Sequence, residues 1–304
     1  MNRQLELNEL IASLFVDKPI AEKLKLITDG VVKIFHADFC RIWMLRKGDL
    51  CSRCMHRKVA QYQHKCRDTE RCLHLLASSG RYTHIDGKGH RRVPVGCYKI
   101  GLIAAAQTPK FLTNDVQNDS RVHNRQWAQE IGLTAFAGYR LLAQGGETVG
   151  VMALFSQQPV TPDEDNLLEA LANTTAQIII TEQSREALKD SELYLRSIVE
   201  SAPDAIISLD GEGLITAWNP KAETFFGWSA AQAVGMNFPQ LVLVQDYREG
   251  FIRCGDFQSG ECVSCGKRCK MLAVKQNKEV FPIEISPSPP HKIGRQNRNK
   301  RFYP

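Results

Sequence analysis

The chain has 304 residues, 43% of them hydrophobic and 24% charged, with a formal net charge of +6. These values are typical of a soluble globular protein of roughly two domains. The longest apolar run, 100–106, is far shorter than the roughly 18 residues of a membrane span, and the N-terminus has no signal-peptide core. We therefore exclude membrane-spanning and secreted classes and expect a cytoplasmic protein without a membrane partner.

Positive charge is concentrated in two stretches, residues 53–71 and the tail 291–304. Basic patches of this kind can bind nucleic acid. No DNA-reading motif accompanies either stretch, so we interpret them as a solvated loop and a basic disordered tail. Nucleic acid is not an expected partner.

The first half of the chain mixes helical and strand patterns. Apolar residues recur at the 3.6-residue helical spacing near the N-terminus, and runs of aromatic and β-branched residues follow. The predicted elements, in chain order, are helices at 7–14 and 20–35, strands at 39–45 and 73–77, a short helix and strand within GLIAAAQTPKFLTND, a helix at 124–131, and a hairpin of 136–142 with 149–155.

A long helix starts at the capping box Thr161-Pro-Asp-Glu164, which places Pro at the first helical position. The helical pattern continues to about residue 200, where Leu188 and Leu195 stand seven residues apart. This spacing favours a two-stranded coiled coil, and a single connector helix lying on one domain is the alternative. We expect a homodimer formed through a helical linker at 183–200.

The second half begins with two strand patterns, PDAIISLDGEG and LITAWNP, joined at a tight Gly-Glu-Gly turn. Short helices and a closing hairpin complete it. The predicted elements are helices at 221–226, 230–234 and 246–254, and strands at 271–274 and 280–286.

Several stretches of the first half occur in the order found in one domain family: FLTNDVQNDSRV, FAGYRLLAQGGETVGVMALFS and TPDEDNLLEALANTTAQIII. Over about residues 6–182 the chain thereby resembles the GAF family. Over about residues 194–288, SIVESAPDAIISLDGEGLITAWNPKAETFFGW and EVFPIEISPSP resemble the PAS family.

The two resemblances imply an α+β fold with two domains, each a central antiparallel sheet with flanking helices, joined by a helical linker. The predicted GAF-like domain spans 1–182 with a cysteine-rich insertion at 51–72. The PAS-like domain spans 201–290, after the linker and before the tail. After Pro290 the sequence is a poor central strand, so we expect an incomplete PAS domain: a fragment, a frameshifted product or half of a swapped dimer, with truncation favoured.

The function that the resemblances imply is sensing. We expect a cytoplasmic regulatory module for signal transduction that binds a small ligand, metal or redox signal and relays it through a helix to an output domain. The alternative is a fragment of a sensor histidine kinase, a two-component phosphorelay enzyme, that has lost its catalytic half. No Ser/His/Asp or paired-carboxylate arrangement and no ATP-binding glycine box is found, so we predict no enzyme activity and name no catalytic residue.

The small-molecule ligand stays open, although two cofactors can be set aside. Light-sensing PAS domains form a flavin adduct through a cysteine of a GxNC motif, and here Phe238 follows Gly235-Met-Asn. Haem-binding PAS domains use a histidine on a helix, and the only histidine after His123 is His291, in the tail. We therefore expect neither a haem nor a flavin adduct.

The insertion between the first two predicted strands carries four cysteines, Cys51, Cys54, Cys66 and Cys72. A CxxC pair with two further thiols is typical of a zinc site, and the same four sulfurs could hold an iron–sulfur cluster. Flanking cations would stabilise the thiolates, and a metal would order a segment that has few apolar side chains. The alternative is a flexible loop with free thiols. Possible replacement ligands are His56, His64 and His74.

The remaining cysteines are less informative. Cys40 alternates with apolar residues and is interpreted as a core thiol, and Cys97 either packs or contacts a ligand or oxidant. Whether a second metal site or a redox dithiol forms is left open for Cys254, Cys262, Cys265 and Cys269.

Overall fold

The computed structural model describes residues 3–54, 56, 66, 68–87, 90–105, 110–122, 124–248 and 269–286. The chain divides into two compact units, Met1–Ala187 and Leu188–Pro304, and each unit mixes helices with antiparallel strands. This confirms the predicted α+β class. Within the described ranges, none of the helices combines the length and the apolar character needed to cross a bilayer.

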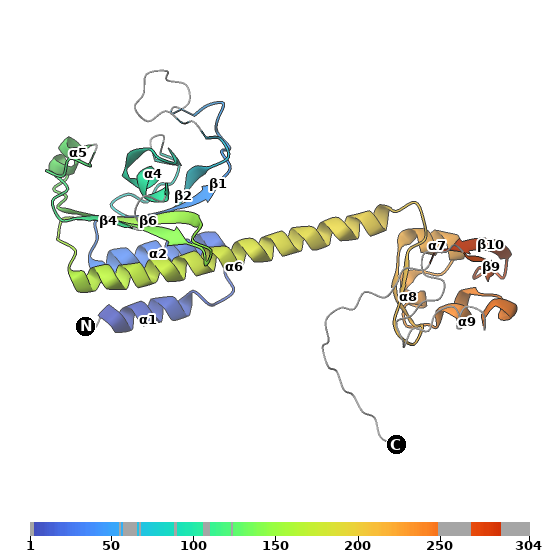
Figure 1. The fold of residues 1–304 in the computed structure, drawn as a ribbon. Helices are drawn as coiled ribbons and strands as arrows, with labels where there is room; N and C mark the ends of the chain where they lie inside the picture. The colour runs from blue at the N-terminus through green and yellow to red at the C-terminus, as the bar shows by residue number, and fades with distance from the viewer. Residues whose placement is uncertain are drawn as a thin grey trace. The chain divides into compact units, whose positions relative to one another are not determined.

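The first unit is built on one six-stranded sheet in the order β3-β2-β1-β6-β5-β4, with antiparallel neighbours throughout. Helices α2 and α6 lie along one face of the sheet and α4 lies on the other (Figure 1). The elements are α1 (Arg3–Ser13), α2 (Ile20–Phe35), β1 (Phe39–Arg46), β2 (Cys72–Gly80), β3 (Arg92–Pro94), α4 (Tyr98–Ala104), β4 (Lys110–Thr113), α5 (Arg125–Glu130), β5 (Ala135–Leu142), β6 (Thr148–Ser156) and α6 (Pro162–Ser201).

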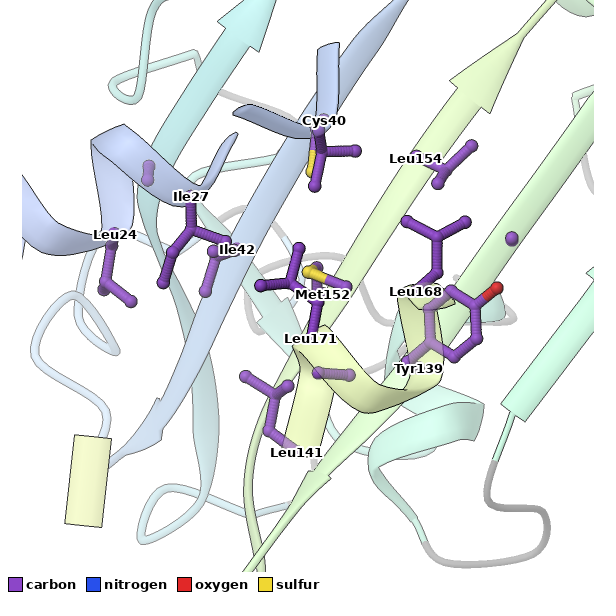
Figure 2. Close-up of a cluster of buried hydrophobic side chains, with 14 of the residues drawn as sticks. Leu24, Ile27, Cys40, Ile42, Tyr139, Leu141, Met152, Leu154, Leu168 and Leu171 are labelled. Atoms are coloured by element: carbon purple, nitrogen blue, oxygen red, sulfur yellow. The ribbon is translucent and has the colours of Figure 1, made fainter. Parts of the chain in front are cut away.

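The sheet face toward α2 and α6, here called the helix face, is apolar. Alternate residues of β1 point to it, because successive side chains of a strand face opposite sides. Figure 2 shows Cys40 and Ile42 of β1 in one buried cluster with Leu168 and Leu171 of α6. Cys40 is fully buried, which confirms it as a core thiol, and burial raises the pKa of that thiol.

Helix α6 starts where the sequence predicts. The backbone N–H of Glu164 donates to Thr161 Oγ1 at 3.3 Å, and the N–H of Thr161 donates to Glu164 Oε2 at 2.8 Å. This reciprocal capping box satisfies two backbone donors at the helix start. The helix begins in the first unit and ends in the second, at Ser201.

The second unit contains two antiparallel strand pairs, β7–β8 and β9–β10, among its described residues. A small core of nine buried residues, including Trp218, Phe226 and Phe238, lies among them and the short helices. Most of the helix predicted at 246–254, and the tail 291–304, lie outside the described residues. The elements are β7 (Ile207–Leu209), β8 (Ile215–Trp218), α7 (Pro220–Phe226), α8 (Ala230–Ala233), α9 (Phe238–Val242), β9 (Cys269–Val274) and β10 (Val280–Ile285).

Candidate functional site

The candidate site lies where the chain leaves β1 and returns to β2. The backbone N–H of Gly48 donates to the carbonyl of Thr69 at 2.7 Å, which holds the two arms of the connection together. A Cβ atom at position 48 would lie 2.5 Å from Cys51 Sγ and 2.9 Å from that carbonyl. Only glycine therefore lets the Cys51 sulfur approach the backbone so closely.

One pocket gathers the four predicted cysteines. Cys51 and Cys54 follow β1, and Cys66 precedes β2. Cys72 is the first residue of β2 and pairs with Pro94 of β3. The pocket is therefore fixed to the sheet edge through β2 and β3. Its lining residues are Gly48, Asp49, Leu50, Cys51, Cys54, Cys66, Asp68, Cys72, Arg92 and Pro94.

The thiols of this pocket affect one another electrostatically. Burial raises the pKa of Cys72 to about 12, and the nearby Cys66, Cys54 and Cys51 add to the rise, whereas Arg92 opposes it. The mutual effect means that deprotonating several of these thiols together is unfavourable without a compensating cation. A metal cation would supply that compensation, because a coordinating thiol is deprotonated and binds the metal as a thiolate.

Arg92 fixes one positive charge at the pocket wall. Its Nε donates to Asp49 Oδ1 at 2.7 Å, and this bond holds the pKa of Asp49 well below its usual range. His74 Nε2 lies 3.7 Å from the same oxygen, and burial lowers the pKa of that imidazole. The Arg92–Asp49 pair is charged and the histidine neutral near pH 7.

The histidines considered as replacement ligands do not line the cysteine pocket in the described part of the chain. His56 is buried, and its Nδ1 lies 3.4 Å from the hydroxyl of Tyr98, while His74 lies on β2; neither is among the pocket-lining residues. His64 lies outside the described residues. In the part of the chain that the structure describes, no group of three or more His, Cys, Asp or Glu residues is arranged to hold a metal ion. Metal binding by the four thiols stays a prediction.

The other cysteines are not part of this pocket. Cys97 is buried at the N-terminal end of α4, a position that suits packing. Cys269 starts β9, while Cys254, Cys262 and Cys265 lie outside the described residues. Whether these four cysteines form a second metal site or a redox dithiol therefore stays open. Phe238 is buried in the core of the second unit.

A group of cations on the sheet face opposite α2 and α6 was not predicted from the sequence. Arg41, Lys99 and Arg140 are all partly or fully buried there. The sequence gave a partial indication for Arg41, because this residue stands between Phe39 and Trp43 on a strand that is otherwise apolar over most of its length.

Family models match both halves of the chain. The model for the GAF domain matches residues 19–179, and the model for the PAS fold matches residues 193–295. A curated relative, sensor protein FixL of Bradyrhizobium diazoefficiens, is 39% identical over 75 residues. That match covers 25% of this chain and only 15% of FixL, so the chain spans a small part of that relative.

Two solved GAF-domain structures are similar to this chain. The GAF domain of a phosphoenolpyruvate-protein phosphotransferase from Coxiella burnetii is 17% identical with a TM-score of 0.47, covering 62% of this chain and 98% of that one. The corresponding Acinetobacter domain is 14% identical with a TM-score of 0.45, covering 62% and 99%.

Proposed function

Because the chain belongs to the GAF family and carries a PAS domain after the GAF domain, we propose that it senses a chemical signal in the first unit and relays it along α6. The two domains make it a sensory module of signal transduction. The observation that best supports a particular signal is the pocket that brings together Cys51, Cys54, Cys66 and Cys72.

The proposed occupant of this pocket is a metal, zinc or an iron–sulfur cluster, with zinc favoured. Four thiols suffice for a tetrahedral zinc site. Burial and the neighbouring thiols raise the pKa of Cys72, which supports a cation as the occupant, because a cation would stabilise the thiolates. Arg92 and its partner Asp49 fix the β3 side of the pocket, so binding would draw the two arms of the β1–β2 connection onto the sheet edge.

Metal analysis of the purified full chain tests this proposal. We expect about one zinc per chain, with no visible absorption, or iron with the charge-transfer bands of a cluster. The double variant Cys51→Ser, Cys54→Ser should lose the metal, because two of four ligands are removed. The matched control is Cys40→Ala, a thiol on the helix face that should leave metal content unchanged. Full metal content in the double variant would contradict the proposal.

The proposed relay is α6, whose second half exposes apolar side chains. Leu188 is 61% exposed and Leu195 59%, seven residues later, and Ile198 is 47% exposed. Exposed apolar residues at this spacing support a two-stranded coiled coil with a second copy of the chain. Sedimentation should then give a dimer for the full chain and a monomer for Leu195→Glu. A monomeric parent chain would exclude this interface.

A second candidate function is that of the input part of a sensor histidine kinase. It is favoured by the 39% identity to a sensor protein over 75 residues. The coding sequence downstream of this chain tests it, since a kinase module should follow in the same or a shifted frame. A downstream region without such a module would remove this candidate and leave the metal proposal untouched.

A further inference from the structure

Helix α4 begins on a residue with an unfavourable backbone conformation. Tyr98, its first residue, has a φ of 55°. This left-handed region is costly for a bulky side chain, and a residue stays in it only where its surroundings hold it there. Gly96, two residues earlier, has a φ of 79°, a conformation that glycine adopts without that cost. The start of α4 is therefore held in place by contacts with other parts of the chain.

One set of contacts comes from the strand that borders the cysteine pocket. The backbone N–H of Gly96 donates to the carbonyl of Gly101 at 2.8 Å, and the N–H of Gly101 donates to the carbonyl of Cys97 at 2.9 Å. A Cβ atom on Gly101 would collide with the carbonyl oxygen of Pro94. The first turn of α4 therefore packs directly on Pro94, which pairs with Cys72 in the wall of the pocket.

A second contact comes from the cysteine insertion itself. His56 is only 2% exposed, and its ring meets the ring of Tyr98 edge to face, with centroids 5.5 Å apart and an interplanar angle of 71°. The Tyr98 hydroxyl lies 3.4 Å from His56 Nδ1, which is long for a hydrogen bond, so we assign the interaction mainly to the ring contact. This contact joins the insertion to the first residue of α4.

His56 lies between the second and third cysteines of the pocket. Cys54 precedes it by two residues, and the backbone N–H of Cys66 donates to the carbonyl of His56 at 2.8 Å. A metal ion holds all its ligands at bonding distance, so an ion shared by Cys54 and Cys66 would restrict the backbone on both sides of His56. The imidazole ring would then be held more firmly against Tyr98.

Helix α4 can respond to such a change because it is short. It has seven residues, fewer than a helix needs to be stable alone in water, and its buried side chains Ile100 and Ile103 hold it to the sheet. Gly138 of β5 makes room for it, since a Cβ atom there would lie 2.6 Å from Ile103 Cδ1. A short helix with an unfavourable first residue opens locally at a small cost in free energy.

We propose that His56 and Tyr98 are positioning residues that make the order of α4 depend on the occupant of the cysteine pocket. The structure shows the ordered state, in which His56 packs on Tyr98 and α4 begins there. Metal in the pocket raises the population of this state, and without metal Tyr98 relaxes more often to a negative φ and the first turn of α4 opens. The inference rests on the proposed metal binding and assigns the first step by which the first unit registers it.

Hydrogen exchange of the full chain, metal-free and loaded with one equivalent of zinc, tests the proposal. In the parent chain, zinc should slow the exchange of the α4 amides by about fivefold, the factor expected for one aromatic contact. Exchange in α2 should not change. His56→Ala should still take up one zinc per chain, but its α4 exchange should no longer respond to zinc. His84→Ala is the matched control, an exposed histidine whose ring meets Tyr82, and it should respond like the parent chain.

Two variants of Tyr98 separate a positioning role from a general loss of stability. Tyr98→Phe keeps the ring and removes only the hydroxyl, so the zinc response of α4 should persist. Tyr98→Gly removes the ring and suits the left-handed φ, so the chain should stay folded by circular dichroism and lose the response. A full zinc response in His56→Ala would overturn the proposal. Loss of zinc from His56→Ala would overturn it too, because His56 would then be a metal ligand.

The same experiment distinguishes failure of this inference from failure of the metal proposal. Zinc uptake by the parent chain with unchanged α4 exchange would overturn the inference alone and leave metal binding intact. A parent chain that takes up no zinc would overturn both, because the pocket would then have no metal occupant for α4 to report.

Discussion

The two faces of the six-stranded sheet are packed by different chemistry. The helix face buries aliphatic side chains of β1, β5 and β6 under α2 and α6, and the cations near it have carboxylate partners. The sheet face covered by α4, here called the α4 face, buries nine apolar strand residues together with Arg41 and Lys99, and Arg140 is half-buried there. Within the described ranges these three cations form no ion pair with a carboxylate. Burial of an apolar face contributes stability, whereas a buried charge without a partner reduces it.

The largest effect should come from the helix face. Leu171→Ala removes a side chain of α6 that is fully buried, and we expect the free energy of unfolding to fall by about 2–5 kcal/mol. Urea unfolding followed by circular dichroism measures this. Leu5→Ala on α1, a leucine that is 60% exposed, is the matched control and should stay within about 0.5 kcal/mol. Equal losses in the two variants would mean that burial of Leu171 at the helix face does not stabilise the fold.

A paired charge on the α4 side should behave unlike the unpaired ones. The hydrogen bonds of Arg121 hold the pKa of Asp119 well below its ordinary value near 4. A carboxyl with a depressed pKa stabilises the fold above its unfolded-state pKa, and this contribution is lost as the pH falls toward the folded-state value. Asp119→Asn should therefore lose about 1 kcal/mol at pH 7, a figure kept small because Arg121 is 62% exposed.

The pH series gives the decisive measurement for Asp119. The gap in unfolding free energy between the parent chain and Asp119→Asn should close progressively below about pH 4. Asp86→Asn, an exposed carboxyl, is the control and should show no gap at any pH. A gap that stays constant down to pH 2 would show that the carboxylate charge is not what stabilises this region.

The sequence was sufficient for the parts of the fold that depend on local patterns. The capping box at Thr161 and the alternation of β1 each rest on a few neighbouring residues, and both were predicted correctly. The three-residue strand β3 was missed, because Arg92–Pro94 is too short for a strand period and contains a proline. Its pairing with β2 supplies Arg92 to the pocket, which local pattern could not show.

Of the two groups of polar side chains, the cysteines could be predicted from local sequence and the cations of the α4 face could not. Cysteine spacing identified four residues that the fold places around one pocket. The α4-face cations were not predicted, because Arg41, Lys99 and Arg140 are far apart in sequence and each is unremarkable alone. Their common position depends on sheet order and on the close approach of α4 at Gly138, which are properties of the assembled fold.

The smallest expected effect compares one cation from each face. Arg140→Met keeps most of the apolar stem and removes a guanidinium whose Nε is buried without a partner, so stability should change by less than about 0.5 kcal/mol. Lys110→Met, beside the helix face, removes an ammonium that donates to Asp165 at 2.8 Å and Glu169 at 2.7 Å, and should lose up to about 1 kcal/mol. Urea unfolding in chloride without other anions measures both. A larger loss in Arg140→Met than in Lys110→Met would mean that the α4-face cations stabilise the fold, and the contrast between the two faces would then lie in aromatic packing alone.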